Sequence, residues 1–575
     1  MSASQLDRVS FIVLRHMRTP LIILVCVYAI CILGMVLMPG LPDANGNTTY
    51  MSFFHAYYFL AYTATTTGFG ELPGEFSNEQ RMWAVVCLYI SVVTWLYAVG
   101  KIISLVKNPH LQSAIDEARF ARAVRRKSRD FYIVCGFGDT GSLLIRGLDD
   151  AGLSAVVLEA DPERIKALEL RDYKSKVLGL CADATVPRFL LDAGIERTNC
   201  VGMLVLTSNE EVNLKIAVAT RLLRPDLKII CRSTSLVNEH EILAIGGDIH
   251  VVDPFSIFAS YLSMIIYNPT MHTLNEWISG ATGVRLDRNI CPVYGKWILC
   301  GYGRMGRVVY KKLMSKNIDV TVIEPSVDNI SKISEHAILG RANTETLERA
   351  GIDEAVGIVA GTNNDTFNLN MLHTANQMNP QLFSIVRQNN HQDEILFEKA
   401  NVDYIMQPSL VIARIVLFSI TAPLLKAFFG HLRELFIQDR NALADIMARL
   451  EREVGGEKPL IKSIVINHSS TKAVCQHLFL DRDVKLVDLY RDPANRDEFL
   501  KAVPMVHKRR GVLTILPPAD LKLHLGDELL FCMKKQDKHL FMASLNNQYT
   551  LEYLITGKEP ARGSLFRWLE RKGFA

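Results

Sequence analysis

The chain has 575 residues, 49% of them apolar, and a formal net charge of +4. Such a length leaves room for two or three soluble domains beside a membrane segment of roughly 105 residues. The small net charge excludes the broad basic surface that nucleic-acid binding requires. The eleven cysteines occur singly without a CxxC pair, which disfavours a disulfide framework or a zinc site and favours reduced thiols.

Two segments near the N-terminus are apolar enough to cross a membrane. Residues 21–38 carry no charge, and residues 83–106 carry only Lys101. A helix of about 20 apolar residues spans the hydrocarbon layer. Basic residues flank the two segments at their outer ends, whereas the connection between them has only Arg81. The positive-inside rule therefore predicts that both ends of this segment face the cytoplasm.

The connection between the two spans predicts an ion pore. Residues 52–63 (SFFHAYYFLAYT) have the length of a short re-entrant helix, and Thr65-Thr66-Thr67-Gly68-Phe69-Gly70 follows. Backbone carbonyls replace the hydration shell of a cation when the chain is extended with its oxygens turned inward, and glycine permits the angles that this needs. Irregular backbone at membrane depth must be covered by protein or line water. Because two spans cannot enclose a pore, several copies must surround one axis.

The rest of the chain contains a repeated nucleotide-binding pattern. In each copy an apolar strand (131–135, 296–300) leads into a glycine turn and a helix, and a second strand ends on an acid. Glu159 and Glu324 both lie 23 residues after the first glycine of their copy. Strands that alternate with helices predict parallel sheets with right-handed crossovers. The glycines let a pyrophosphate approach a helix N-terminus, and the acid accepts hydrogen bonds from ribose hydroxyls.

The two copies differ at the position after the second glycine. Arg304 occupies it in copy two, where a cation meets phosphate, and Asp139 occupies it in copy one, where a carboxylate repels phosphate. Arg307 is a second candidate cation or an exposed residue of the helix surface. We therefore expect nucleotide binding more strongly in copy two than in copy one.

Acidic residues in copy one predict a second ligand. Asp183, Glu210 and Glu211 follow strands, at the edge of the sheet where ligands bind. Three carboxylates suit Ca²⁺, which prefers several oxygen ligands. The alternatives are ordinary polar loops, or contact of Asp183 with an adenine. The equivalent positions of copy two, Asn343 and 363–365, carry less charge.

The pore segment resembles the potassium channels. Their filter pattern, Thr-Val-Gly-Tyr-Gly, is similar to Thr66-Thr67-Gly68-Phe69-Gly70, and Glu71 stands where the family usually has Asp. The resemblance implies a homotetramer in which the carbonyls of residues 66–69 and the Thr66 hydroxyl bind K⁺. Thr67 in place of Val is a departure, so a weakly selective cation channel is an alternative.

The repeated copies resemble RCK domains, the regulators of K⁺ conductance. The resemblance implies that NAD, ADP, ATP or Ca²⁺ binds there and shifts the gate, and that four chains form a ring of eight units. The residues that it places around a nucleotide are Gly136, Gly138, Gly141, Glu159, Asp183, Gly301, Gly303, Arg304, Met305, Gly306 and Glu324.

The predicted fold class is an α-helical transmembrane pore, followed by tandem α/β Rossmann-like domains and a small α+β C-terminal lobe. The expected boundaries are a pore domain (1–107), a linker (108–129), copy one without its C-lobe (130–290), copy two (291–456), the C-terminal lobe (457–545) and a tail (546–575). The apolar stretch 410–430 contains Arg414, Pro423 and Lys426. It therefore predicts a swapped dimerisation helix rather than a third span.

Together these features predict a multi-pass plasma-membrane channel for K⁺ with cytoplasmic regulatory domains that bind adenine nucleotides or Ca²⁺. The predicted partners are the lipid membrane, K⁺, the nucleotides and three further copies of the chain, without nucleic acid. A membrane-anchored NAD-dependent oxidoreductase is a remote alternative, because no His, Tyr or Lys has an identifiable catalytic context. We therefore do not expect an enzyme.

Overall fold

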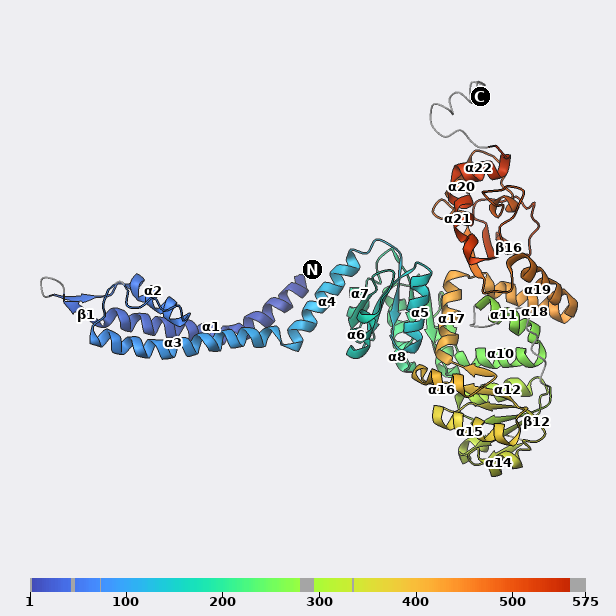
Figure 1. Ribbon diagram of the computed structural model, residues 1–575, viewed down its shortest axis with the longest axis horizontal. Coiled ribbons are helices and arrows are strands. Elements are labelled where there is room, and N and C mark those ends of the chain that lie inside the picture. Colours follow the sequence, from blue (N-terminus) through green and yellow to red (C-terminus); the bar gives the residue numbers. More distant parts are fainter. Residues whose placement is uncertain (1–2, 43–46, 73, 280–293, 334–335, 559–575) are drawn as a thin grey trace, which may run out of the picture. The chain divides into compact units, whose positions relative to one another are not determined.

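A computed structural model describes residues 3–42, 47–72, 74–279, 294–333 and 336–558. The predicted boundary at residue 290 and the tail beyond 558 lie outside these residues. Figure 1 labels the helices and strands in chain order.

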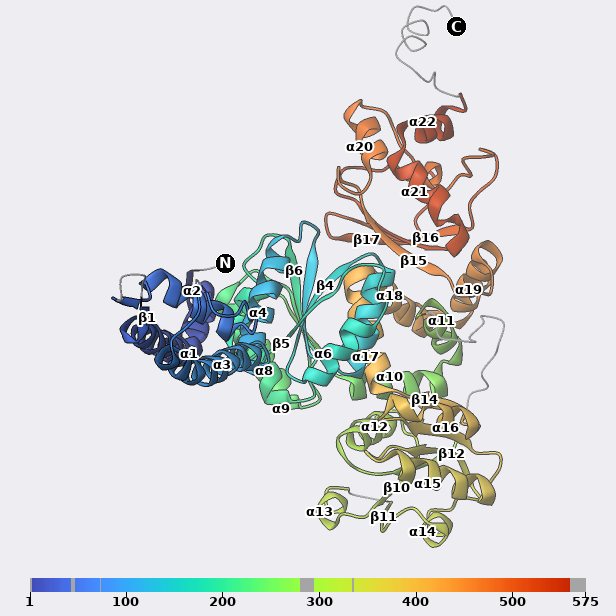
Figure 2. The same ribbon diagram turned by 60° about the vertical axis from the view of Figure 1, so that its left-hand side comes forward.

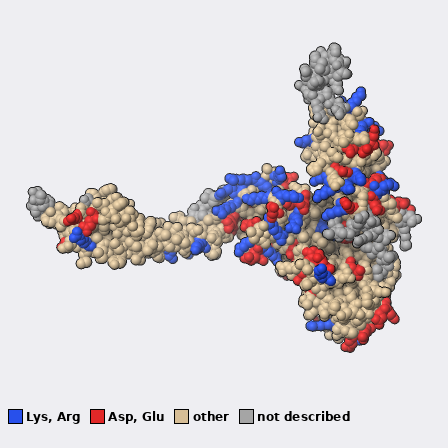
Figure 3. All heavy atoms as spheres, in the orientation of Figure 1, with Lys and Arg blue, Asp and Glu red and all other residues tan. Residues whose placement is uncertain are grey.

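Two long helices with a short helix between them form the N-terminal segment. The elements are α1 (Ala3–Leu37), β1 (Pro39–Pro42), β2 (Thr48–Tyr50), α2 (Phe53–Ala64) and α3 (Asn78–Val106). Within the described residues, two helical stretches have the length and hydropathy to cross a membrane, Val13–Leu37 and Asn78–Val106. Figure 3 shows that charged residues are sparse along this segment. The predicted pair of spans with a short helix between them is confirmed.

Tight packing and helix caps define this segment. Gly34 of α1 lies against the Trp83 ring of α3, where an added Cβ would come within 2.1 Å of the indole. Ser77 begins α3 with a capping box, because its hydroxyl accepts from the Gln80 N–H while Gln80 accepts from the Ser77 N–H. Ser52 caps α2 in a similar way through the His55 N–H. These contacts fix where the short helix and the second span begin.

Helix α4 (Pro109–Arg125) follows α3 directly and has one buried face. Phe120, Ala121 and Val124 on that face are nearly inaccessible to solvent. Glu117 of α4 forms an ion pair with Arg188 of α7 (Pro187–Asp192). The predicted linker is therefore largely a packed helix in contact with copy one.

Two six-stranded sheets follow, and both have the Rossmann strand order 3-2-1-4-5-6. The first unit (131–252) contains β3 (Phe131–Cys135), β4 (Ser154–Glu159), β5 (Leu178–Cys181), β6 (Cys200–Val205), β7 (Ile229–Arg232) and β8 (Ile249–Val252). The second unit (296–406) contains β9 (Lys296–Cys300), β10 (Val320–Glu324), β11 (Ala337–Leu339), β12 (Ala355–Ala360), β13 (Phe383–Arg387) and β14 (Tyr404–Met406). The second sheet is parallel throughout, so the predicted tandem Rossmann-like fold is confirmed.

Helices connect the strands in both units. In the first unit they are α5 (Asp139–Asp150), α6 (Pro162–Leu170), α7, α8 (Glu210–Leu223) and α9 (Leu236–Ala244). In the second unit they are α12 (Arg304–Met314), α13 (Val327–Ile330), α14 (Thr344–Arg349), α15 (Asp365–Met378), η1 (His391–Asp393) and α16 (Glu394–Lys399). Figure 2 shows α6 and α8 on opposite sides of strands of the first sheet. Both glycine loops thus lead from the central strand of a sheet into a helix, as the motif requires.

The two units exchange helices. Helix α10 (Pro254–Tyr267) leaves the first unit and packs on α12 of the second, whereas α17 (Pro408–Thr421) leaves the second unit and packs on α5 of the first. Phe258 and Leu262 of α10 are fully buried in one core with Trp297 and Met305 of the second unit. This reciprocal packing joins the two units through apolar surface.

The helix α18 (Leu425–Gln438) continues from α17 at an angle of 105°. By length and composition this bent pair passes as a broken span. Phe428 and Leu432 of α18 are nevertheless fully buried in a protein core. This burial favours the predicted packing role of residues 410–430.

The C-terminal lobe combines a four-stranded sheet of order β15-β18-β16-β17 with several helices. Its elements are α19 (Arg440–Val454), β15 (Leu460–Val465), α20 (Lys472–Phe479), η2 (Leu486–Leu489), β16 (Ala502–Arg509), β17 (Val512–Ile515), β18 (Glu528–Met533), η3 (Lys535–Asp537), α21 (Lys538–Asn546) and α22 (Gln548–Thr556). The small α+β lobe that the sequence predicts is therefore present.

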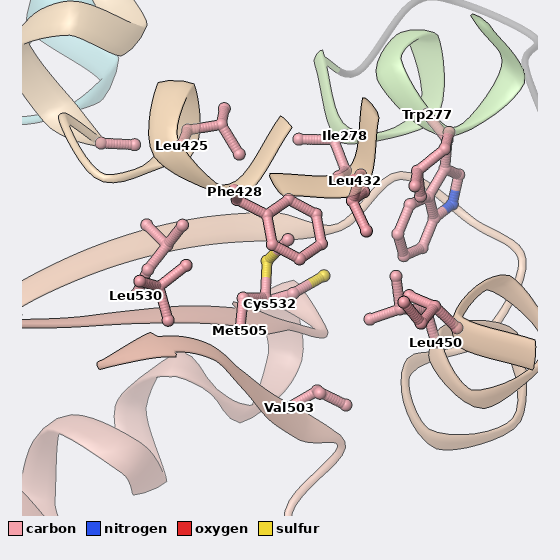
Figure 4. Packing of buried hydrophobic residues seen from close by; sticks show 14 of the residues in the cluster. Trp277, Ile278, Leu425, Phe428, Leu432, Leu450, Val503, Met505, Leu530 and Cys532 are labelled. Carbon is pink, nitrogen blue, oxygen red and sulfur yellow. The ribbon is translucent and has the colours of Figure 1, made fainter. Parts of the chain in front are cut away.

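Helix α11 (Pro269–Ser279), which follows α10, contributes to the core of this lobe. Figure 4 shows Trp277 of α11 close to Leu432, Leu450 and Cys532. The Trp277 Nε1–H donates to the carbonyls of Gly456 (3.0 Å) and Glu457 (2.8 Å). Between β8 and β9 the described residues form only α10 and α11, so no C-lobe strands of copy one occur among them.

Candidate functional site

The loop after α2 has an alternating backbone. Thr66, Gly68 and Gly70 have φ angles of 59°, 70° and 88°, in the left-handed region, whereas the residues between them do not. Such alternation turns successive carbonyls toward the same side of an extended chain. A row of carbonyls on one side is the geometry that a cation filter requires. A positive φ at Thr66 is unfavourable for a β-branched residue, and such strain typically occurs at functional sites.

Hydrogen bonds with α2 and within the loop stabilise residues 65–70. The Tyr62 hydroxyl, on α2, donates to the Gly70 carbonyl at 2.6 Å. The Thr65 and Thr67 hydroxyls lie 3.0 Å apart, and the Thr65 hydroxyl is 2.9 Å from the Ala61 carbonyl. The hydroxyl by which Thr67 differs from the valine of the filter pattern thus has a partner within its own loop.

Glu71, directly after the loop, is fixed by the second span. Arg81 of α3 donates from Nε and Nη2 to the two carboxylate oxygens of Glu71, at 2.8 and 3.0 Å. The Phe76 N–H donates to the same carboxylate at 2.9 Å. This pairing connects the outer end of the loop to α3, a contact that the sequence pattern does not reveal.

The second Rossmann unit contains a cavity of about 760 Å³ at the carboxyl end of its sheet. Strand ends, the glycine loop and the first turns of the following helices line it, including Gly301, Gly303, Arg304, Met305, Glu324, Arg341, Asn343, Asn364, Phe367 and Arg387. Pockets that bind small molecules have this size range. The predicted residues of copy two, apart from Gly306, thus meet around one cavity.

The three glycines of copy two have separate roles. Gly301 has a φ of +99°, which favours glycine. A Cβ on Gly306 would come within 2.0 Å of the Gly301 carbonyl oxygen, whereas a Cβ on Gly303 would meet no atom within 4 Å. The first and third glycines therefore shape the turn, and the second leaves the N-terminus of α12 open to the cavity.

The acid at the end of β10 supports the glycine loop. One oxygen of Glu324 accepts from the Tyr302 N–H at 2.5 Å, and the other accepts from the Ser326 N–H at 3.1 Å and the Asn329 side chain at 3.2 Å. Glu324 is only 6% exposed and still lines the cavity. The carboxylate thus orients the loop and is placed to accept from a ribose hydroxyl.

Three arginines of the second unit line the cavity, namely Arg304, Arg341 and Arg387. Burial, together with the positive charge of Arg304, lowers the pKa of Arg387 to about 10. Arg307 instead donates to the Tyr302 carbonyl at 3.3 Å and to Asn329 at 3.1 Å. The cavity is therefore electropositive, and Arg307 supports the loop rather than the cavity.

Copy one repeats the loop geometry. Gly136 has a φ of +101°, and a Cβ on Gly141 would come within 2.2 Å of the Gly136 carbonyl oxygen. Glu159 accepts from the Phe137 N–H at 2.5 Å and from the Asp161 N–H at 3.0 Å. The strand, turn and acid of the two copies therefore follow the same design.

Copy one also has a cation that the sequence interpretation missed. The Arg164 guanidinium on α6 lies 3.8 Å from Glu159 and would be 3.3 Å from a Cβ on Gly138. It therefore stands at the glycine loop, on the side where a phosphate would approach. The available signal was the arginine five residues after the acid, where copy two has Asn329.

Two of the carboxylates predicted to bind calcium have hydrogen-bond donors as partners. Glu210 accepts from the Ser233 and Thr234 hydroxyls, both at 2.7 Å, and from the Thr234 N–H at 2.9 Å. Asp183 accepts from the Thr185 N–H at 2.9 Å within its own turn. Over the residues that the structure describes, no three His, Cys, Asp or Glu side chains are grouped to hold a metal ion. Asp183 thus stabilises its own turn, and Glu210 stabilises the loop between β7 and α9.

Sequence comparison assigns both Rossmann units to one domain type. The TrkA-N domain matches residues 132–253 and again residues 297–408. The TrkA-N domain thus matches the chain twice in tandem, behind two helices of membrane-spanning length.

Three proteins illustrate the similarity. Potassium channel protein 1 of Methanocaldococcus jannaschii is 22% identical over 218 residues, covering 38% of this chain and 63% of that protein. A Trk system potassium uptake protein TrkA homolog of Pyrococcus abyssi is 29% identical over 172 residues, covering 29% of this chain and 73% of that protein. Among solved structures, the GsuK channel bound to NAD aligns with a TM-score of 0.44 and 15% identity, over 94% of this chain and 99% of that one. The chain thus matches less than two thirds of the length of the potassium channel protein.

Proposed function

We propose that the protein is a tetrameric K⁺ channel of the plasma membrane, gated by an adenine nucleotide that binds in its second TrkA-N domain. The alternating backbone of residues 66–70, between two helices of membrane-spanning length, carries this proposal. Carbonyls on one side of an extended chain replace the hydration shell of an alkali cation only when several such chains face one axis. Relatives that are named potassium channel proteins support the same reading.

Selectivity for K⁺ is part of the proposal. The Thr67 hydroxyl interacts with Thr65 behind the loop, so it is not needed at the ion path. The carbonyls of residues 66–69 and the Thr66 hydroxyl then provide the ion sites. A weakly selective cation channel would instead require Thr67 to face the ions.

Exposed apolar surface on the TrkA-N domains supports an assembly of several chains. In the first unit, α8 and α9 expose Val218, Leu222, Leu236, Val237 and Leu243, and in the second unit α16 exposes Ile395 and Leu396, whereas the exposed Phe367 of α15 lines the cavity. Clusters of exposed apolar side chains mark interaction surfaces. Because α9 and the corresponding α16 both expose apolar residues, four chains can cover these surfaces in a ring.

The cavity of the second unit fits an adenine nucleotide. Its glycine loop opens the N-terminus of α12 toward the cavity, where N–H groups and the helix dipole favour phosphate. Arg304 adds a positive charge at that point, and Glu324 offers an acceptor to the ribose. NAD and ADP both carry these groups.

Helix α4 provides the path from the ligand to the pore. It follows the pore-lining helix α3 directly and contacts the first unit through Glu117 and Arg188. The basic residues after α3 support a cytoplasmic location for this side. A nucleotide shifts the gate only if it binds the open and closed arrangements with different affinities.

Ion flux into vesicles tests the proposal. The purified full-length protein, reconstituted into lipid vesicles, should pass K⁺ in preference to Na⁺, and ADP or NAD⁺ on the cytoplasmic side should change the flux. Gly68→Ala, at a φ of +70°, should abolish the flux while nucleotide binding persists. Gly74→Ala is the matched control, because an added Cβ meets no atom within 4 Å at either glycine but only Gly68 has a φ in the left-handed region. A complete absence of K⁺ flux, or a flux that Gly68→Ala leaves intact, would contradict the pore assignment.

A further inference from the structure

Arg304 makes a contact that joins the two TrkA-N domains. Its Nη1 donates to the Thr234 hydroxyl at 2.7 Å. Arg304 is the first residue of α12, in the glycine loop of the second unit, whereas Thr234 lies between β7 and α9 of the first unit. The side chain that lines the nucleotide cavity therefore also reaches the neighbouring domain.

Thr234 is itself held within the first unit. Its hydroxyl donates to Glu210 at 2.7 Å, and its N–H donates to the same oxygen at 2.9 Å. Glu210 begins α8. The Thr234 hydroxyl accepts from Arg304 and donates to Glu210, so a continuous chain of hydrogen bonds runs from the cavity to α8 of the first unit.

The surroundings of Arg304 are crowded with positive charge. Burial lowers the pKa of Arg232, at the end of β7, and that of Arg387, at the end of β13, and the charge of Arg304 lowers both further. Glu210 and Asp365 oppose these effects, yet both carboxylates already accept hydrogen bonds from a neighbouring loop, Glu210 from the Thr234 N–H and Asp365 from the Asn389 N–H. A phosphate that entered the cavity would therefore find Arg304 available at the cost of one hydrogen bond to a neutral hydroxyl.

We propose that the Arg304–Thr234 contact is a latch between the two domains, which a nucleotide phosphate opens by drawing Arg304 into the cavity. This inference rests on the proposed nucleotide binding in the second unit and names how it is regulated. A phosphate offers the guanidinium a negative charge and a bidentate acceptor, which the neutral Thr234 hydroxyl does not. Opening the latch releases the loop of Thr234 and, through Glu210, the start of α8.

The latch has a direction. Asp139, the residue of the first unit that corresponds to Arg304, has an acidic side chain in place of the guanidinium and its several N–H donors. Occupancy of the second unit is therefore signalled to the first unit, whereas the first unit has no equivalent donor at this position.

Thermodynamic linkage gives the latch an unusual signature. A nucleotide must break the Arg304–Thr234 bond in order to bind, so removing that bond from the Thr234 side should tighten binding. Loss of one hydrogen bond of ordinary net strength corresponds to a gain of about three- to tenfold in affinity. Ordinary damage to the fold weakens binding, so the sign of the change distinguishes a latch from a structural role.

Titration of the full-length protein with ADP and with NAD⁺ tests the latch. Thr234→Val should bind nucleotide about three- to tenfold more tightly than the wild type and should show a smaller nucleotide-dependent change in K⁺ flux. Thr234→Ser keeps the hydroxyl and should behave like the wild type. Arg304→Gln should bind more weakly, whereas Arg307→Gln, which removes an equal charge next to the cavity, should change the affinity less.

Two failures are distinguishable. If the wild type binds nucleotide, and Thr234→Val binds with the same or lower affinity while its thermal unfolding matches that of Thr234→Ser, the latch is wrong and the proposed function stands. If neither the wild type nor any variant binds ADP or NAD⁺, the proposed function fails, and the latch fails with it.

Discussion

Two glycine substitutions in one loop should distinguish an effect on nucleotide affinity from an effect on stability. Gly303 and Gly306 lie three residues apart at the start of α12, and both belong to the motif. An added Cβ at Gly303 points into open space, whereas one at Gly306 would come within 2.0 Å of the Gly301 carbonyl oxygen. We expect Gly303→Ala to fold and to lose nucleotide affinity, and Gly306→Ala to destabilise the second unit.

The magnitudes follow from these contacts. Gly303 is the N-cap of α12 with a φ of −68°, so alanine there costs less than about 1 kcal/mol. The added methyl would separate a phosphate from the loop N–H groups, and we expect an affinity loss of at least about tenfold, or 1.4 kcal/mol. At Gly306 the loop must move by roughly 1 Å to relieve the overlap, and overpacking of this kind costs about 1–3 kcal/mol or more.

Thermal unfolding with and without nucleotide measures both effects. At a nucleotide concentration 100 times the Kd, the wild type should gain about 2.7 kcal/mol. Gly303→Ala should unfold near the wild-type Tm without ligand and should keep no more than about half of that gain. Gly306→Ala should unfold earlier by about 2–4 °C per kcal/mol lost. A full ligand-induced shift in Gly303→Ala would show that phosphate does not sit at this loop, and an undiminished Tm in Gly306→Ala would refute the steric argument.

Three further predictions concern other parts of the chain. Thr67→Val should leave the reversal potential in a K⁺/Na⁺ gradient unchanged, because the Thr67 hydroxyl interacts with Thr65; a shift toward the K⁺ potential would mean that this hydroxyl faces the ions. Glu71→Gln weakens the clamp to Arg81 and should reduce K⁺ flux at unchanged ADP affinity, with the charge-preserving Arg81→Lys less affected. His272 is 4% exposed, and burial lowers its pKa to about 4. Between pH 6.5 and 4 the unfolded chain binds the extra proton, so the free energy of unfolding should fall as the pH falls, by up to about 1.4 kcal/mol per pH unit. His272→Phe should remove this slope. Burial also raises the pKa of the nearby Glu276. Because Glu276 is present in both proteins, its contribution to the pH dependence cancels when His272→Phe is compared with the wild type.

Local patterns were sufficient to predict the repeated strand–turn–helix units and the parallel sheets. The glycine turns and the acids of β4 and β10 lie close in sequence to the strands that they join, so their spacing alone indicates the fold. The caps at Ser52 and Ser77 are also local. The N-terminal helix, which begins at Ala3 rather than near residue 21, is longer than its apolar part, because hydropathy records the membrane-spanning stretch and not the polar turns that precede it.

Contacts between distant residues could not be predicted in this way. Arg304 and Thr234 are 70 residues apart and meet only because α10 and α17 exchange between the units. The hydrogen-bond partners of Glu210 are another example. Glu210 is at the expected sheet edge, but its oxygens accept hydrogen bonds from N–H and O–H donors of the neighbouring β7–α9 loop. The spacing of residues along the sequence does not reveal which donors lie near a carboxylate.

The exchange of helices also restricts how a nucleotide in the second unit can affect the pore. Phe258 and Leu262 of α10 are fully buried in the core of the second unit, so separating the units would expose apolar surface at about 25 cal/mol per Å². A single phosphate contact cannot supply that free energy, which leaves changes in the polar contacts between the units. The chain joins α3 to the second unit only through α4 and the first unit, and α4 contacts that unit at Arg188. Any signal from the cavity must therefore cross into the first unit, and the Arg304–Thr234 bond is a polar contact that makes this crossing at the cavity itself.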